Sequence, residues 1–295
     1  QASALLLAPP PTAPRAAPHP GKRNRLGVAA WPLLGRPAPA MAADSCFKPL
    51  THLREVPLDP AAAALVVVDV QNFVCHPEGA EWKHLPREDQ LRGEAHFWAD
   101  MPRAVQNIKA LLGAFRQKRV EVLYTTIESL TKDGRDRSLD YKISGFNVPR
   151  GSWDGKVLAD VAPLDDEIVL PKTSCSVFVS TNMVLCCGGR GYMSNIGALQ
   201  GGLVIQEEHA VTYEACSTQA YVLRNLGVKQ VVLVGGLTDQ CVESAVRDAC
   251  DMGFLVTQVT DACYTMSAER QTSSIRAVKG YCRQRTTAQL LEEVA

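Results

Sequence analysis

The sequence has no excess of charge of either sign and no long apolar run. Its 31 basic and 31 acidic residues balance over 295 residues, so it lacks the positive field that attracts nucleic acid or an anionic membrane. No apolar stretch reaches the roughly 18 residues of a membrane-spanning helix. Hydrophobic residues make up 46% of the chain and charged residues 21%, as in ordinary soluble domains. We therefore expect no nucleic-acid partner and no membrane partner.

The chain also lacks the cysteine spacing of a zinc cage or a disulfide scaffold. Its ten cysteines are scattered without a Cys-x-x-Cys pair, which does not fit either class of site. Free thiols are typical of a reducing compartment, so we expect a cytoplasmic protein.

Residues 1–43 contain no Asp or Glu, and half of the 18 prolines lie in the first 40 residues. A proline-rich segment of this kind cannot bury enough apolar surface to fold, so we expect a disordered leader. It resembles a plastid or mitochondrial transit peptide. The alternative is an artefact of the gene model, with translation starting at Met41. On either interpretation the folded domain is expected over 44–295.

Buried-strand patterns alternate with helical patterns along this domain. Uninterrupted apolar runs predict strands, and apolar residues at a period of 3.6 predict helices. Strands are expected over 62–68, 120–127, 166–170, 231–234, 254–260 and 281–285, and helices over 102–118, 157–162, 221–227, 267–279 and 287–294. This alternation predicts a three-layer α/β/α fold with a doubly wound, mostly parallel six-stranded sheet. Residues 75–98 are expected to form a surface loop.

Residues 183–220 show neither the helical period of 3.6 nor a strand pattern for long. A structureless loop of that length is improbable inside a compact domain. We interpret the segment as an atypical insertion, either a retained intron or a lineage-specific addition.

The stretch 230–253 predicts a strand, a tight turn at Gly235 and Gly236, and a helix capped by Thr238 or Asp239. Cys241 then falls in the first helical turn, where the helix dipole favours a thiolate. It is a candidate nucleophile, or alternatively a small buried apolar residue.

Asp69 and Lys172 also follow predicted strands. The carboxyl ends of parallel strands share one edge, where ligands bind, so both side chains are expected near Cys241. A thiolate, a carboxylate and an ammonium suffice for covalent hydrolysis of a carbonyl compound. Arg135 and Arg137, in a charged stretch after Glu128, either bind an anionic group of the substrate or form a solvated loop.

Three motifs, at Val66–Gln71, Leu170–Phe178 and Val234–Ala249, resemble the isochorismatase-like cysteine hydrolases. This family includes nicotinamidases, N-carbamoylsarcosine amidase, biuret hydrolase and ureidoacrylate amidohydrolase, and the resemblance covers about residues 60–182 and 221–290. It implies that Asp69 is the general acid and base, that Lys172 completes a triad, and that Cys241 is the nucleophile.

The resemblance also implies a cis peptide at Gly236–Leu237 and an oxyanion hole formed by the backbone of Leu237 and Cys241. The implied reaction cleaves a small amide or ureido substrate through a thioester, without an organic cofactor. Nicotinamidases of the family hold a metal with an Asp-x-His pair, which this chain lacks, so we expect no metal. We take Phe73, Glu128 and Phe178 as candidate substrate-binding residues, and we expect a homo-oligomer.

Two departures from the family pattern concern single residues. The aromatic residue Phe73 follows Asn72 directly, one position from its usual place, and Gln271 stands where a histidine is usual. The alternatives are a vinyl-ether hydrolase of the isochorismatase type, or an impaired family member that serves as an interaction module. A nucleotide-binding domain is disfavoured because no Gly-rich loop follows the first strand.

Overall fold

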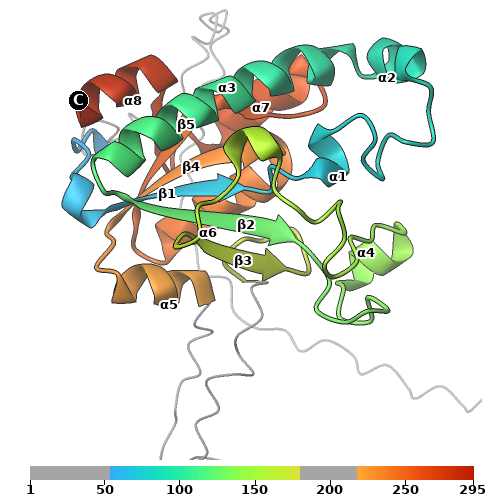
Figure 1. Cartoon of the computed structure of the whole chain (residues 1–295). Helices are drawn as coiled ribbons and strands as arrows, with labels where there is room; N and C mark the ends of the chain where they lie inside the picture. The colour runs from blue at the N-terminus through green and yellow to red at the C-terminus, as the bar shows by residue number, and fades with distance from the viewer. Residues whose placement is uncertain (1–53, 180–217) are drawn as a thin grey trace, which may run out of the picture. The chain divides into compact units, whose positions relative to one another are not determined.

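A computed structural model describes residues 54–179 and 218–295. The predicted leader and most of the predicted insertion lie outside these residues, so both assignments remain predictions. The described residues form a six-stranded sheet with helices on its two faces (Figure 1). Its strands are β1 (Ala63–Val68), β2 (Glu121–Ile127), β3 (Ile168–Lys172), β4 (Gln230–Gly236), β5 (Leu255–Tyr264) and β6 (Arg283–Arg285).

All neighbouring strands run parallel, in the order β3-β2-β1-β4-β5-β6. The chain builds one half of the sheet outward from β1 and then returns to the other side of β1 with β4. The predicted doubly wound α/β/α fold is therefore confirmed. Strand order reverses between β1 and β4, which is the place where sheets of this kind bind their ligands, beyond the carboxyl ends of the strands.

Strand β1 is buried on both faces because its side chains alternate between two hydrophobic cores. Leu65 and Val67 point to one core, and Ala64 and Val66 point to the other. This arrangement explains why the strand reads as a continuous apolar run rather than as an alternation of apolar and polar residues.

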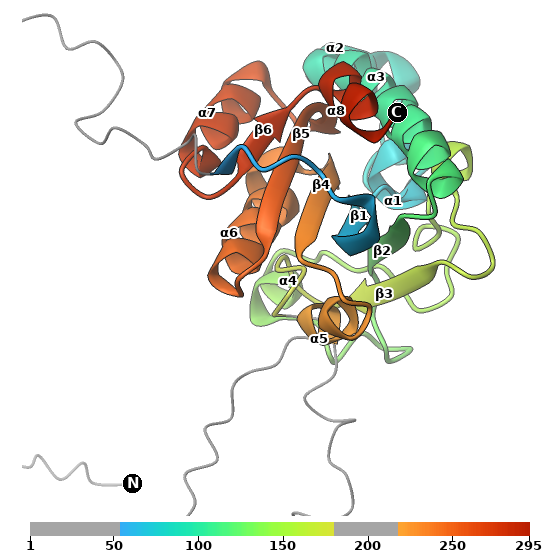
Figure 2. The same ribbon diagram turned by 90° about the vertical axis from the view of Figure 1, so that its left-hand side faces the viewer.

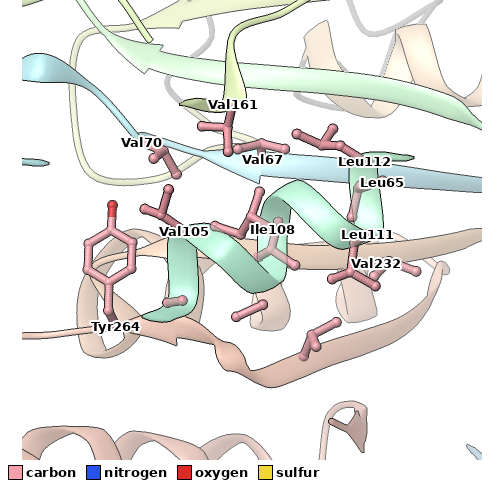
Figure 3. Packing of buried hydrophobic residues seen from close by; sticks show 14 of the residues in the cluster. Leu65, Val67, Val70, Val105, Ile108, Leu111, Leu112, Val161, Val232 and Tyr264 are labelled. Carbon is pink, nitrogen blue, oxygen red and sulfur yellow. The ribbon is translucent and has the colours of Figure 1, made fainter. Parts of the chain in front are cut away.

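Helices cover both cores, and Figures 1 and 2 show them on opposite sides of the sheet. The first core is covered by α3 (Ala95–Gln117) and α8 (Thr287–Val294), and the second by α5 (Thr218–Asn225), α6 (Glu243–Asp251) and α7 (Ala268–Val278). Figure 3 shows Ile108 and Leu111 of α3 packed above the sheet, with Leu65 and Val232 beside them. No helix in the described ranges is both long and apolar enough to cross a membrane.

Helix α3 is longer than the sequence pattern predicts. It begins at Ala95 rather than at Pro102, so the proline lies inside the helix. An interior proline costs about 3 kcal/mol. However, Phe97 and Trp98 in the preceding turn are both buried, and each large apolar side chain contributes roughly 1.5–3 kcal/mol on burial. The burial outweighs the lost backbone hydrogen bond, and the apolar face continues across the proline.

The prediction of a loop over 75–98 is also wrong in part, since α2 (Arg87–Gly93) and the start of α3 lie within it and α1 (Asn72–Cys75) ends at its first residue. Trp82 organises this excursion. Its side chain is buried, its Nε1 donates to the carbonyl of Val74 at 2.6 Å, and its ring lies 5.4 Å from that of Phe97. The excursion is therefore packed against α3.

Side chains cap the starts of the last two helices. The remaining elements are two 3₁₀ turns (Pro60–Ala62 and Ala159–Val161), α4 (Leu139–Ile143) and a π-helical turn (Thr238–Val242). Ser267 caps α7, and Thr286 forms a capping box with Gln289 at the start of α8. These side chains accept backbone N–H groups that have no partner inside the helix.

Strand β5 extends to Tyr264, beyond the predicted end at Thr260. Its pairing with β4 shifts register between Leu233 and Gly235. Gly235 has φ of 114°, and a Cβ atom there would lie 2.1 Å from the carbonyl oxygen of Val68. Only glycine lets β4 approach β1 this closely just before the turn that leads to Cys241.

Replacing Gly235 with alanine is expected to lower the free energy of unfolding by at least about 2 kcal/mol, because it adds a backbone clash to an unfavourable φ. Gly253 is a matched control, since it has φ of 89° but open space around a built Cβ. Gly253→Ala should cost only about 1 kcal/mol. Urea denaturation of both variants measures the difference, and equal losses would show that the close approach at Gly235 is not a constraint.

Candidate active site

The structure brings Asp69, Lys172 and Cys241 together at the carboxyl edge of the sheet. Asp69 follows β1, Lys172 ends β3, and Cys241 lies just after β4. The Lys172 Nζ lies 2.9 Å from the Asp69 Oδ2 and 3.3 Å from the Cys241 Sγ. The three residues therefore converge at the point where strand order reverses, as expected from their places after the strands.

Asp69 is held in place from both its backbone and its side chain. Its φ of 50° lies in the left-handed region, where Asp is among the better tolerated residues. Its N–H donates to the carbonyl of Thr125 at 3.1 Å, and the Thr125 hydroxyl donates to its Oδ1 at 2.9 Å. The other carboxylate oxygen, Oδ2, faces Lys172. Strand β2 thus fixes the carboxylate that β1 supplies.

Lys172 is completely buried, yet every described contact of its Nζ suits a cation. Besides Asp69 and Cys241, the Nζ donates to the carbonyls of Ser174 at 2.9 Å and Cys175 at 3.1 Å. Burial opposes its charge, but the negative charge of Asp69 and the hydrogen bond to its carboxylate outweigh burial and raise the pKa of Lys172 above its usual value. The side chain is therefore a fixed ammonium, not a base.

Cys241 lies in a π-helical turn (Thr238–Val242) that precedes α6. The predicted cap at Thr238 or Asp239 is wrong, because the residue before the turn is Leu237 and no side chain caps it. The Asp239 carboxylate instead accepts from the Thr265 hydroxyl and from the Arg270 guanidinium. A π-turn of this kind is frequent at functional sites, and here it carries the candidate nucleophile.

A second sulfur lies against Cys241. The Sγ atoms of Cys175 and Cys241 are 3.7 Å apart. This hydrogen bond, together with burial and the nearby Asp69, raises the pKa of Cys241 well above that of an ordinary thiol, although Lys172 acts in the other direction. The same hydrogen bond lowers the pKa of Cys175 against the effect of burial. Either sulfur can be the donor of this hydrogen bond, so the expected thiolate at Cys241 stays a prediction.

A pocket of about 420 Å³ opens onto Asp69 and Cys241. Phe73, Tyr141 and Phe146 form an aromatic wall, with the ring of Phe146 4.7 Å from that of Phe73 and 4.6 Å from that of Tyr141. Other lining residues are Gln71, Val74, Glu81, Trp82, Glu94, Ile127, Asp140, Ser144, Gly236, Leu237, Gln240, Met266 and Arg270. The size of the pocket and its aromatic wall suit a small organic substrate.

Among the predicted substrate-binding residues, Phe73 lines this pocket and the other two do not. The Glu128 carboxylate accepts the N–H of Gly151 at 2.5 Å, so it fastens a loop. Phe178 is fully buried, and its ring packs 6.3 Å from that of Phe254 in the second core. Neither side chain lines this pocket, because proximity to a motif in the sequence does not fix the direction of a side chain.

The side chains of the two arginines after Glu128 contact groups of their own loop and do not line the pocket. Arg135 pairs with Asp133 at the surface, and the Arg137 guanidinium donates to the carbonyls of Gly134 and Phe146. Of the two interpretations open at the sequence level, the structure favours the solvated loop.

Two expectations from the resemblance concern the backbone and Gln271. The peptide bond between Gly236 and Leu237 is cis, while the oxyanion-hole role of Leu237 and Cys241 remains a prediction. The Gln271 side chain donates to the carbonyls of Thr260 and Cys263, so it joins α7 to β5.

Sequence reasoning missed Tyr141, Phe146, Trp82 and the sulfur of Cys175. Tyr141 ends the charged stretch after Glu128, and Trp82 lies in the excursion read as a loop. Cys175 stands only three residues after Lys172, inside a motif used for the resemblance. A search for aromatic and thiol side chains within the segments that follow β1, β2 and β3 would have identified them as candidates.

Replacing Cys175 with alanine is expected to lower the pKa of Cys241. The change removes the hydrogen bond with Cys175, which raises the pKa of Cys241, while the ammonium of Lys172 stays. Alkylation of Cys241 by iodoacetamide, followed against pH by peptide mass spectrometry, should therefore begin at lower pH in Cys175→Ala than in the wild type. Cys250→Ala is the control. An unchanged or higher midpoint for Cys241 would contradict the assigned hydrogen bond.

Comparisons with known proteins agree with this geometry. Ureidoacrylate amidohydrolase RutB of Rhizobium rhizogenes is 24% identical over 230 residues, which cover 72% of this chain and 75% of that protein. The corresponding protein of Agrobacterium fabrum is also 24% identical and is covered to 81%.

Solved structures share the fold. A cysteine hydrolase from Pseudomonas syringae pv. phaseolicola has a TM-score of 0.58 and 22% identity, over 81% of this chain and 95% of its own. N-carbamoylsarcosine amidase from Thermoplasma acidophilum has a TM-score of 0.50 and 20% identity, over 76% of this chain and 96% of its own. The model of the Isochorismatase domain matches residues 63–192 and 200–289. Since these residues make up well over half of the chain, the protein belongs to the isochorismatase family.

Proposed function

We propose that this protein is a cysteine-dependent amidohydrolase that cleaves the C–N bond of a small amide or ureido compound through a thioester. The observation that carries the proposal is the contact of one buried ammonium, Lys172, with both a carboxylate and a thiol, at 2.9 Å and 3.3 Å. Such a set supplies a nucleophile, a group that moves protons, and a fixed positive charge. The pocket beside it is large enough for a small substrate.

In the first half of the reaction, the Cys241 sulfur attacks the carbonyl carbon. The thiol proton passes to Asp69 and then to the leaving nitrogen, so that ammonia or an amine departs as the C–N bond breaks. Lys172 stabilises the negative charge on the sulfur as it forms, because it is already an ammonium 3.3 Å away. The raised pKa of Cys241 makes this proton transfer to Asp69 a necessary step rather than an accessory one.

In the second half, Asp69 takes a proton from water, and the resulting hydroxide adds to the thioester carbon. The C–S bond breaks, the acid leaves, and the Cys241 thiol is restored with the proton from Asp69. The carboxylate therefore alternates between base and acid, which requires a fixed position. The hydrogen bond from Thr125 to Oδ1 supports that position.

The names of the relatives support hydrolysis at carbon–nitrogen bonds. RutB of Rhizobium rhizogenes is a ureidoacrylate amidohydrolase, and a structural neighbour is an N-carbamoylsarcosine amidase. Their substrates do not transfer to this chain at such identities. The lining of the pocket instead suggests that the charge of the substrate affects binding. Glu81, Glu94 and Asp140 line the pocket, and the Arg270 guanidinium pairs with Asp239 at 2.5 Å. We propose that a neutral amide or urea is preferred to its anionic analogue.

A screen of small amides, ureas and ureido acids for release of ammonia tests the proposal, with neutral and carboxylate-bearing members in matched pairs. On the best substrate, Cys241→Ser should lower kcat/KM by at least about 1000-fold. Asp69→Asn should lower it by about 100- to 10,000-fold, because the amide keeps the shape but cannot move protons. Asp140→Asn makes the same change elsewhere on the pocket wall and should have a much smaller effect. Equal losses in Asp69→Asn and Asp140→Asn would contradict the role of Asp69.

A vinyl-ether hydrolase of the isochorismatase type is the second candidate. Burial and the contact with Cys175 raise the pKa of Cys241, and a raised pKa suits chemistry in which the carboxyl acts and the sulfur does not attack. Isochorismate in the same screen distinguishes the two reactions. A Cys241→Ala protein that keeps full activity on a vinyl ether, and that releases no ammonia from any amide, would replace the amidohydrolase proposal.

A further inference from the structure

Two cysteines from distant parts of the chain meet at the site. Cys175 lies in the loop after β3, and Cys241 lies in the π-turn after β4. Their sulfurs are 3.7 Å apart, and both thiols are free. The proposed amide chemistry uses one of these sulfurs and gives no role to the other. A second thiol in contact with a nucleophile has a chemistry of its own, because two such sulfurs can be oxidised as a pair.

We propose that Cys175 and Cys241 form a reversible disulfide when the protein meets a peroxide, so that Cys241 is held in a reducible disulfide and is not oxidised irreversibly. The pair is thus a modification site, separate from the hydrolytic reaction. Only its consequence for activity rests on the proposed function, since the disulfide would remove the nucleophile.

The geometry allows the bond with a local movement. The sulfurs must close from 3.7 Å to the roughly 2.0 Å of a disulfide. Cys241 is held in a helical turn, but Cys175 lies among bends between the end of β3 and Val177 and belongs to no helix or strand. A change in the side-chain torsion of Cys175, with a small shift of its loop, therefore brings the sulfurs together without disturbing the sheet.

Access and charge favour oxidation at Cys175 first. Its side chain is partly exposed, whereas Cys241 is buried. The lowered pKa of Cys175 and the raised pKa of Cys241 place the more reactive thiolate on Cys175, which is the form that peroxide attacks. Lys172 lies beside the pair and donates to the carbonyl of Cys175, so a positive charge stays close to the reacting sulfurs.

The disulfide forms in two steps that conserve atoms and electrons. The Cys175 thiolate attacks one oxygen of hydrogen peroxide, the O–O bond breaks, and after protonation the products are a sulfenic acid and water. The Cys241 sulfur then attacks the Cys175 sulfur, the S–O bond breaks, and the departing hydroxide takes the Cys241 proton to leave as a second water. Each sulfur is oxidised by one electron, and one peroxide is reduced to two waters. Dithiothreitol reverses the change by thiol–disulfide exchange.

The test is peptide mapping of the full chain after treatment with one equivalent of hydrogen peroxide and blocking of the remaining thiols. Trypsin leaves Cys241 in the peptide 230–247 as its sole cysteine, but it leaves Cys175 together with Cys186 and Cys187 in the peptide 173–190. Fragmentation of the cross-linked peptide, repeated in a Cys186→Ser/Cys187→Ser protein, identifies the partner. We expect a cross-link between Cys175 and Cys241 that dithiothreitol removes. A link from Cys241 to another cysteine, or none at all, would overturn the proposal.

Two variants test the protective role. In Cys175→Ser the cross-link cannot form, so excess peroxide should leave Cys241 as a sulfinic acid that dithiothreitol does not reduce. In the wild type the same treatment should be reversed by dithiothreitol. Cys250→Ser is the matched control, since Cys250 is another partly exposed free cysteine, and it should behave as the wild type does. If Cys241 is recovered equally in the wild type and in Cys175→Ser, Cys175 does not protect it. Because the readout is the mass of the peptides, the result does not depend on whether the protein hydrolyses amides.

Discussion

The buried ammonium of Lys172 is the interaction on which the rest of the site depends. It connects the end of β3 to the carboxylate after β1 and to the sulfur after β4, although β3 and β4 are not neighbours in the sheet. A buried charge without partners is costly, and removal of one member of a buried ion pair typically costs about 3–5 kcal/mol. The Asp69–Lys172 pair is therefore poor evidence for stability but strong evidence for a fixed geometry. Its partners leave the cation little freedom to move.

The fold explains why three such distant residues meet. In a doubly wound sheet every strand ends at the same edge, and the reversal of strand order between β1 and β4 opens a place beside that edge. Gly235 near the end of β4 lets this strand approach β1 closely, and the π-turn then places Cys241 at the edge of the sheet. The excursion held by Trp82 and the loop that carries Tyr141 close the pocket from the sides. The second sulfur, at Cys175, is added to this frame by the loop after β3.

The sequence predicts the strands and the residues at their carboxyl ends well, but it predicts the pocket lining poorly. Buried parallel strands are continuous apolar runs, so the strand ends, and with them Asp69, Lys172 and Cys241, can be located without coordinates. Side-chain direction in loops has no such periodic signal. The sequence therefore points to Glu128 and Phe178, which do not line the pocket, and not to Tyr141 and Phe146, which do. Helix α3 was predicted too short because Pro102 is a strong local signal, whereas the burial of Phe97 and Trp98 that overrides it is tertiary. The pKa of Cys241 depends on a contact with Cys175 that no spacing in the sequence reveals.

The central claim is that the ammonium and the carboxylate act on the sulfur as one unit. The most direct measurement is kcat/KM on the best substrate of the screen for Asp69→Asn, Lys172→Met and the double variant. If the two residues act as a unit, the double variant should lose no more activity than the more damaging single change. If their losses multiply, as they do for independent sites, the account of a single buried triad is contradicted.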